Sequence, residues 1–293
     1  MVSLMRSSLI WSRLSKGVFP LYKGFKEYYA DNANLAYLYE HMNENVAECA
    51  VNEYLIVHNE AGEVIDKLKW TGNEYKHLAY KTLANDYVGK IRPRNLQQEL
   101  AFDMLQDDET TVKALLGCFG SGKTMLMIAT ALQLVRQGKF ERIVYVRNNI
   151  EVKDSKPLGA LPGTANEKLM PFAMPFADHV GGMDGLEYLQ RTGKLEITHL
   201  GYLRGRDIKN SILMVSESGN LTREHMQLLL GRVGEGSNLW LDGDLKQVDM
   251  KVFEQNSGLS AAIDRLKGNH LFAYVHLEKT ERSETAALAD LLD

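Results

Sequence analysis

One octet constrains the fold of this chain more than any other part of its sequence. Residues 117–124 read GCFGSGKT and match the G-x-x-x-x-G-K-[ST] pattern of a phosphate-binding loop. Residues 113–116, which read KALL, predict a short strand before the octet, and residues 125–136 predict an amphipathic helix after it, with Gly138 just beyond. The motif requires this order of strand, loop and helix, so we predict a βα unit that binds a nucleoside triphosphate.

Each part of this loop has an expected role in binding phosphate. Glycines allow consecutive backbone N–H groups to curve around an anion, and Lys123 adds a positive charge beside the β- and γ-phosphates. The hydroxyl of Thr124 is expected to ligate Mg²⁺. The alternative, a Gly/Ser turn that happens to precede a lysine, does not explain the strand and helix on either side. The expected nucleotide contacts are Gly117, Cys118, Phe119, Gly120, Ser121, Gly122, Lys123 and Thr124.

Length, net charge, cysteine content and hydropathy limit the number of domains, the binding partners and the cellular compartment that we expect. A length of 293 residues allows one large domain, or one domain with a small appendage. The net charge of −4 gives no overall attraction for nucleic acid, so such binding needs a local basic surface. Cys49 and Cys118 lie far apart, which favours a reducing compartment over disulfides or a zinc site. No apolar run reaches membrane-spanning length, so we expect a cytoplasmic protein without a membrane partner.

The pattern of the chain changes near residue 90. Residues 1–90 predict a small appendage, with a helix over residues 33–42 and a β-hairpin over residues 53–72. Residues 91–293 alternate apolar strands with helices or loops, which is typical of an α/β fold whose mainly parallel sheet is flanked by helices. Ligands on such sheets bind beyond the carboxyl ends of the strands. The predicted strands are residues 113–116, 142–147, 195–199, 211–215, 238–241 and 271–277.

The motif after the strand at residues 211–215 corresponds to the Walker B position. RecA-like ATPases usually place an Asp-Glu pair there: the Asp holds magnesium through water, and the Glu polarises the attacking water. This chain has Ser216 at the Asp position and retains Glu217. We therefore expect Glu217 to be a catalytic residue and part of the magnesium site, and the alternative is a solvated loop carboxylate.

Two later motifs extend the expected site. Residues 242–249 read DGDLKQVD, and a loop of this GDxxQ type presents Asp244 and Gln247 as sensors of the γ-phosphate. A simple turn is the alternative for this loop. Arg282 follows the last strand and is suited to stabilise charge on the γ-phosphate during transfer, or else lies on the surface before Ser283, an N-cap candidate.

An amide upstream of the phosphate loop is a candidate for base recognition. Residues 93–98 read PRNLQQ and open a helix before the first strand of the α/β region. In superfamily-one helicases an amide at this place reads the adenine edge. Gln98 fits that spacing best and Gln97 fits it second.

A basic stretch with an aromatic residue is the candidate for nucleic-acid contact. Residues 202–209 read YLRGRDIK, and stacking combined with phosphate contacts is how single strands are held. The alternatives are a solvated basic surface, or arginines that reach phosphates bound by a neighbouring subunit. The expected contacts are Tyr202, Arg204, Arg206, Arg147, Lys153 and Lys156.

Seven motifs in order resemble those of the PhoH-like ATPases of bacteria and bacteriophages, which are related to the core of superfamily-one helicases. They are PRNLQQELAFDML, GCFGSGKT, LGALPGTANEKLMPFAMPFAD, LGYLRGRD, SESGNLT, GDLKQVD and ERSE. From about residue 52 onward, the resemblance implies a RecA-like P-loop ATPase that uses ATP and Mg²⁺, associates with RNA or single-stranded nucleic acid, and forms homo-oligomeric rings, with hexamers favoured. About 50 residues precede the hairpin, too few for the PIN nuclease domain of larger relatives and without an obvious quartet of metal-binding aspartates, so the resemblance does not extend to ribonuclease activity.

The sequence departs from this family at Walker B. The family's Asp-Glu-Ala-Gln-Asn corresponds to residues 216–220, so the resemblance places Ser216 at the carboxylate and Gly219 at a phosphate-sensing amide. Because Thr124 and Glu217 are retained, we expect slow but real hydrolysis. One alternative is a nucleotide-gated RNA-binding oligomer with little turnover. Another is a small-molecule kinase, which the GDLKQVD loop and the late arginine disfavour, and helicase activity stays open.

Overall fold

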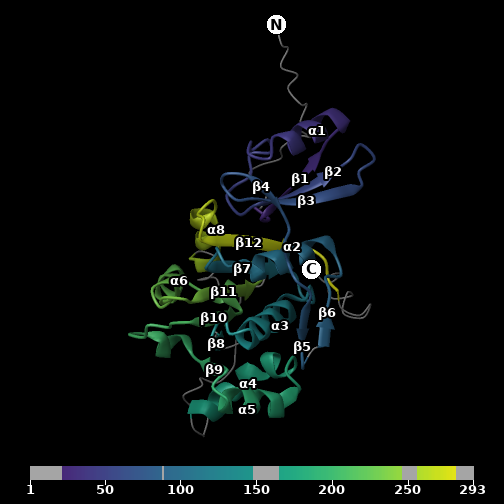
Figure 1. Ribbon diagram of the computed structural model, residues 1–293. Helices are drawn as coiled ribbons and strands as arrows, with labels where there is room; N and C mark the ends of the chain where they lie inside the picture. The colour runs from purple at the N-terminus through teal and green to yellow at the C-terminus, as the bar shows by residue number, and fades with distance from the viewer. Residues whose placement is uncertain (1–21, 88, 148–164, 246–255, 282–293) are drawn as a thin grey trace, which may run out of the picture.

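A six-stranded sheet lies at the centre of the molecule, and every neighbouring pair of its strands is parallel (Figure 1). The computed structural model describes residues 22–87, 89–147, 165–245 and 256–281. The order of the strands across the sheet is β12-β7-β11-β10-β8-β9. The six predicted strands are confirmed, with ends that differ by at most two residues. They are β7 (Val112–Gly117), β8 (Arg142–Arg147), β9 (Leu195–Thr198), β10 (Ser211–Ser216), β11 (Asn238–Gly243) and β12 (Phe272–Leu277).

Helices cover both faces of this sheet, because side chains alternate between the two faces along each strand. On β10, Ile212 and Met214 pack in one cluster with residues of α2, α3, α4 and α5, whereas Leu213 and Val215 pack in another with residues of α6 and α8. The predicted α/β architecture is therefore confirmed. The helices are α2 (Leu96–Gln106), α3 (Lys123–Arg136), α4 (Ala165–Ala177), α5 (Gly182–Arg191), α6 (Arg223–Leu230) and α8 (Gly258–Leu266).

The helix after the phosphate loop, α3, is buried along most of its length, from Leu126 to Val135. It ends where the sequence predicts, because Gly138 has φ 76° and donates its N–H to the Val135 carbonyl at 3.1 Å. Its start is two residues earlier than predicted, at Lys123. None of the helices in the described parts of the chain combines the length and apolar character needed to cross a membrane.

A smaller four-stranded sheet lies next to β12 at one end of the molecule, and β9 with α4 and α5 lies at the other end (Figure 1). In the four-stranded sheet, the β2–β3 pair is the predicted hairpin, and α1 (Asn32–Glu40) is the predicted helix. The sequence did not predict β1, which pairs with β2 in parallel, or β4. Its strands are β1 (Phe25–Tyr29), β2 (Tyr54–His58), β3 (Val64–Trp70) and β4 (Tyr75–His77).

Hydrogen bonds fasten this smaller sheet to the α/β region. The buried Tyr54 hydroxyl donates to Asp103 of α2 at 2.8 Å, and the Asn52 amide donates to the carbonyls of His270 and Phe272 at 2.9 and 3.1 Å. A short hairpin, β5 (Leu83–Asn85) and β6 (Gly89–Ile91), then leads into α2. The expected division of the chain after residue 90 stays a prediction.

Lys113, on the strand that leads to the phosphate loop, is a buried charged side chain, only 1% exposed. The Lys113 ammonium donates to the carbonyls of Leu105 at 3.0 Å and Asp107 at 2.5 Å, and lies 5.6 Å from the centre of the Trp240 ring. Burial lowers the pKa of Lys113 to about 7. The native protein therefore loses a proton at this residue at a much lower pH than the unfolded chain does.

Lys113→Met is expected to remove a pH-dependent part of the folding stability. Between the folded pKa of about 7 and the unfolded pKa of 10.5, the unfolded chain binds more protons, so stability rises with pH in this window. In this window Lys113 adds up to ~1.4 kcal/mol per pH unit to the free energy of unfolding. Urea unfolding should show that the free energy of unfolding rises less between pH 7 and pH 9 for Lys113→Met than for the wild type. The exposed control Lys194→Met should keep the wild-type slope, and equal slopes for all three proteins would contradict this account of Lys113.

Candidate functional site

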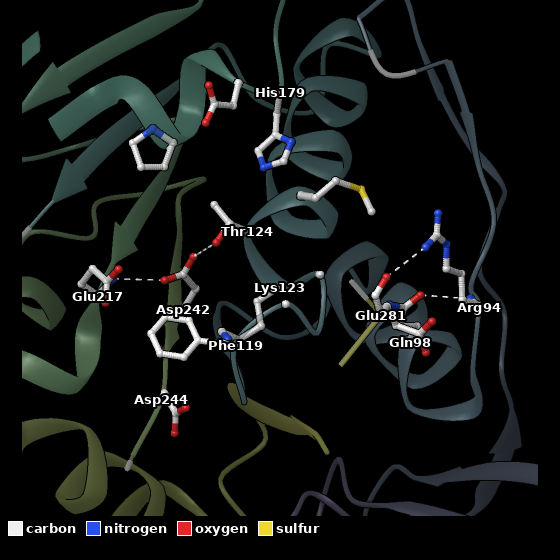
Figure 2. A pocket seen from close by; sticks show the side chains of 16 residues that line it. Arg94, Gln98, Phe119, Lys123, Thr124, His179, Glu217, Asp242, Asp244 and Glu281 are labelled. Atoms are coloured by element: carbon white, nitrogen blue, oxygen red, sulfur yellow. Dashed lines mark hydrogen bonds between the residues drawn. The ribbon is translucent and has the colours of Figure 1, made fainter. Parts of the chain in front are cut away.

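A cavity of about 480 Å³ opens at the carboxyl ends of β7, β10 and β11, where the sequence places its motifs (Figure 2). The phosphate loop forms one wall of this cavity. Glu217 follows β10, and Asp242 and Asp244 lie at the end of β11. His179, just after α4, faces the loop from the opposite side. The sheet thus brings together residues that are more than a hundred positions apart in sequence.

The phosphate loop takes the backbone shape that its glycines allow. Gly117, Gly120 and Gly122 have φ values of 152°, 68° and 90°, in the left-handed region that side chains disfavour. At Gly117 a Cβ atom would also lie 2.2 Å from the Leu277 carbonyl oxygen of β12. Gly122 is the N-cap of α3, so the positive end of a 14-residue helix points into the loop. This geometry suits an anion.

The loop's lysine already lies inside the curve of the loop. The Lys123 ammonium donates to the carbonyl oxygens of Gly117 at 2.6 Å and Cys118 at 2.8 Å. Burial lowers the pKa of Lys123, and the nearby carboxylates of Asp242 and Asp244 act against this shift. A desolvated ammonium is a strong partner for phosphate oxygens.

The other loop residues differ in their surroundings. Ser121 is buried, and its hydroxyl donates to the Cys118 carbonyl at 2.9 Å, which closes the turn. The Cys118 N–H donates to Leu277 at the end of β12 at 3.3 Å. Phe119 is 59% exposed on the cavity wall. An exposed aromatic ring in this position offers an apolar surface beside the loop.

The Thr124 hydroxyl is held by a carboxylate that the sequence analysis did not identify. Thr124 Oγ1 donates to Asp242 Oδ2 at 2.8 Å, and the Glu217 N–H donates to Asp242 Oδ1 at 3.1 Å (Figure 2). The Asp242 side chain lies between the phosphate loop and the Walker B segment, and the residue is only 4% exposed. The signal for it was an acidic residue at the end of a buried strand, at the start of the loop 242–249 in which only Asp244 and Gln247 were predicted to face the phosphate.

The Walker B segment presents its glutamate to the cavity. Glu217 has φ 58°, and its half-exposed carboxylate pairs with Arg147 Nη2 of β8 at 3.6 Å. The preceding Ser216 is buried at the end of β10. Arg147, predicted to bind nucleic acid, therefore lies beside the predicted catalytic carboxylate. Gly219 is buried in the 3₁₀ turn that follows.

The predicted base-recognition amide contacts the phosphate loop itself. Gln98 is 2% exposed; its Nε2 donates to the Ser121 carbonyl at 3.0 Å, and its Oε1 accepts the Arg94 N–H at 3.0 Å. The Gln97 amide instead pairs with Glu278 after β12. In this structure both ends of the Gln98 amide are engaged by the protein, and its role with adenine stays a prediction.

The residues next to Gln98 tie the start of α2 to the end of β12. Arg94 Nη1 donates to the Glu281 carbonyl at 3.2 Å, and Asn95 donates to the Glu281 carboxylate at 2.5 Å. The Glu281 N–H in turn donates to the Gly120 carbonyl of the phosphate loop at 2.9 Å. Figure 2 shows Arg94, Gln98 and Glu281 grouped on one side of Lys123.

The predicted nucleic-acid residues fall into two groups. Tyr202 is 61% exposed at the 3₁₀ turn Leu200–Leu203 after β9, and Arg204 is also exposed. Arg206 instead forms a two-point ion pair with Glu196 of β9, at 2.5 and 3.0 Å, and this pairing lowers the pKa of Glu196. Among the predicted residues, Arg282, Gln247, Lys153 and Lys156 lie outside the described residues.

Comparisons with known proteins identify relatives of this chain. The family described as PhoH-like protein matches residues 90–290. Protein PhoH2 of Bacillus subtilis is 32% identical, with 93% of this chain and 64% of the relative covered. Protein PhoH2 of Mycolicibacterium smegmatis is 34% identical, with 68% and 46% covered. The chain thus spans about half to two thirds of the length of these relatives. A solved SWI2/SNF2 ATPase core of Sulfolobus solfataricus in complex with dsDNA matches with a TM-score of 0.34 and 14% identity over 57% of this chain and 34% of its own.

Proposed function

Because the chain belongs to the PhoH-like protein family, we propose that it binds and hydrolyses ATP with Mg²⁺ and couples this to RNA or single-stranded nucleic acid. The observation that carries the proposal is the phosphate loop, whose Lys123 and Thr124 face the same cavity as Glu217. The loop N–H groups and the start of α3 bind the phosphates. Lys123 adds charge at the β- and γ-phosphates.

The donor atoms at the site suit magnesium. Mg²⁺ prefers oxygen ligands, and Thr124, Glu217 and Asp242 present a hydroxyl and two carboxylates to one side of the loop. Bound Mg²⁺ supplies positive charge that neutralises the β- and γ-phosphate oxygens. Thr124 would ligate the ion directly.

Glu217 is the proposed general base. Its half-exposed carboxylate stands at the cavity wall, where it accepts a hydrogen bond from a water molecule aimed at the γ-phosphate. Arg147 holds this carboxylate from β8. We assign Asp244, with Gln247, to monitoring the γ-phosphate and Arg282 to supplying positive charge during transfer.

The direct test is steady-state ATP hydrolysis with Mg²⁺, measured with and without single-stranded RNA. Turnover that RNA stimulates is the expected result. The alternative, a nucleotide-gated RNA-binding oligomer, draws on the absence of an acid at Ser216 and of an amide at Gly219. ATP-dependent assembly without turnover would favour that alternative. Analytical ultracentrifugation with and without ATP tests the homo-oligomeric ring that we infer for either function.

The proposed nucleic-acid surface begins at Tyr202 and Arg204. The turn that carries them follows β9, and in a parallel sheet the carboxyl ends of all strands share one edge, so this surface lies on the same side as the ATP site. An exposed aromatic ring beside an exposed guanidinium provides stacking and phosphate contact. Arg206 is assigned a structural role through Glu196.

Tyr202→Ala is expected to weaken single-stranded RNA binding roughly 5- to 150-fold, the effect of losing one stacked base. Arg204→Ala should reduce the slope of log affinity against log salt by about 0.7, because one phosphate contact is lost. Fluorescence anisotropy with labelled RNA at several salt concentrations measures both effects. Lys76→Ala, an exposed lysine on the smaller sheet, is the matched control. If both site variants behave as the control does, this surface does not bind RNA.

A further inference from the structure

We propose that Asp242 holds the magnesium ion in this protein, and so does the work that the family assigns to an acid at position 216. The inference rests on the proposed ATP site, which offers two carboxylates to a metal ion, and goes beyond it by assigning the metal to Asp242, on a different strand from position 216. On this proposal the metal-binding carboxylate is kept in this chain, at position 242 on β11 instead of position 216 on β10. Four features of the structure carry this inference: strand register, strand order, hydrogen bonding and charge.

Strand register places positions 216 and 242 side by side on one face of the sheet. Val215 pairs with Leu241 in the parallel ladder between β10 and β11, so the next residues along each strand, Ser216 and Asp242, are neighbours. Each lies two residues after a member of one cluster, Met214 on β10 and Trp240 on β11, so both are on the face of the sheet that packs against α2 to α5. Adjacent strands are about 4.8 Å apart, so a carboxylate at either position reaches nearly the same space.

The order of the strands favours position 242. β11 lies between β10 and β7, the strand that ends in the phosphate loop. A side chain at the end of β11 is therefore one strand nearer the loop than a side chain at the end of β10. The contact between Asp242 and Thr124 at 2.8 Å is the direct result.

The hydrogen bonds of Asp242 leave the Thr124 oxygen ready for a cation. A hydroxyl that donates its hydrogen to a carboxylate keeps its lone pairs free to accept or to ligate. Thr124 is such a donor, and the Glu217 N–H fixes the other oxygen of Asp242. The same carboxylate thus orients the proposed magnesium ligand and the backbone of the proposed general base.

Charge explains why one acid, and not two, occupies this place. Asp242 is nearly fully buried, and a buried carboxylate is tolerated when hydrogen bonds and a positive charge compensate it. The Thr124 hydroxyl, the Glu217 N–H and the Lys123 ammonium provide that compensation. A second carboxylate at position 216 would repel it, because two neighbouring acids cannot both stay ionised at low cost. The small neutral Ser216 fits beside Asp242.

The test measures metal binding directly. A fluorescent ATP analogue is titrated into the full chain in EDTA and in Mg²⁺, and Mn²⁺ binding is followed by EPR with a non-hydrolysable ATP analogue. For Asp242→Asn, which keeps the shape of the side chain, we expect unchanged affinity in EDTA and about a 10-fold or greater loss of the Mg²⁺-dependent gain. Mn²⁺ affinity should fall in parallel. Asp264→Asn, which removes an exposed acid from α8, away from the cavity lining, should keep the wild-type metal dependence.

A double variant separates relocation from mere disruption. Ser216→Asp combined with Asp242→Asn returns the carboxylate to the family's position and should restore most of the Mg²⁺-dependent gain. Full Mg²⁺ and Mn²⁺ dependence in Asp242→Asn would overturn the assignment of Asp242 while leaving the ATP site intact. Failure of the wild-type chain to bind the nucleotide under any condition would instead overturn the proposed function, and the assignment with it.

Discussion

Lys123→Ala is expected to abolish measurable ATP turnover and to weaken nucleotide binding by about 10- to 150-fold. The estimate is the free energy of a charge-assisted hydrogen bond, ~1.5–3 kcal/mol. In the structure the ammonium lies inside the loop and donates to the Gly117 and Cys118 carbonyls. Burial there lowers the pKa of Lys123 and also reduces the screening of its charge by water. Isothermal titration calorimetry with a non-hydrolysable ATP analogue measures the loss of affinity.

Lys139→Ala is the matched control for this experiment. Lys139 follows α3 at its far end and pairs on the surface with Asp108, so its removal takes away a lysine without touching the site. Its affinity for the analogue should equal that of the wild type. If Lys123→Ala binds as tightly as Lys139→Ala, the loop does not hold phosphate in the way proposed.

Glu217→Gln is expected to lower turnover by about 10²- to 10³-fold while leaving ATP affinity nearly unchanged. A positioned general base contributes roughly 10²–10⁴ to the rate, and glutamine keeps the shape of the side chain but cannot take a proton. The kcat from steady-state hydrolysis and the affinity from titration, measured on the same preparation, separate the two effects. A loss of affinity equal to the loss of kcat would mean that Glu217 binds substrate and does not activate water.

Two further variants test whether the loss of turnover in Glu217→Gln comes from losing the general base or from breaking the ion pair between Glu217 and Arg147. Arg147→Gln breaks the same pair from the other side and keeps the Glu217 carboxylate, so its turnover should fall less than that of Glu217→Gln. Glu187→Gln removes an exposed acid from α5, at the far end of the molecule, and should hydrolyse ATP at the wild-type rate.

The sequence predicted those parts of the fold whose signals are local. The octet, the buried apolar strands and Gly138 each occupy a short window, and all of them appear where expected. By contrast, β1 becomes a strand by pairing with β2 in parallel, about 30 residues later, and its burial alternates weakly. β4 is three residues long. Neither has a periodic pattern long enough to read alone.

The candidate site shows the same limit. Residue types and strand ends could be read from sequence, whereas their partners depend on which strands are neighbours. Asp242 meets Thr124 across 118 positions, and only the strand order brings them together. Similarly, the sequence shows the arginine at 206 but not that Glu196 already binds it.

The hydrogen bonds around Glu281 bear on the entropy of nucleotide binding. Three distant segments meet there: the start of α2 through Arg94, the phosphate loop through Gly120, and the end of β12. Gln98 adds a second anchor at Ser121. A loop held by hydrogen bonds on two sides has few alternative conformations. It therefore loses little conformational entropy when a ligand binds, and more of the contact energy is retained as affinity. The same hydrogen bonds would also couple these segments mechanically, because a displacement of α2 or of the residues just after β12 would displace the backbone of the phosphate loop.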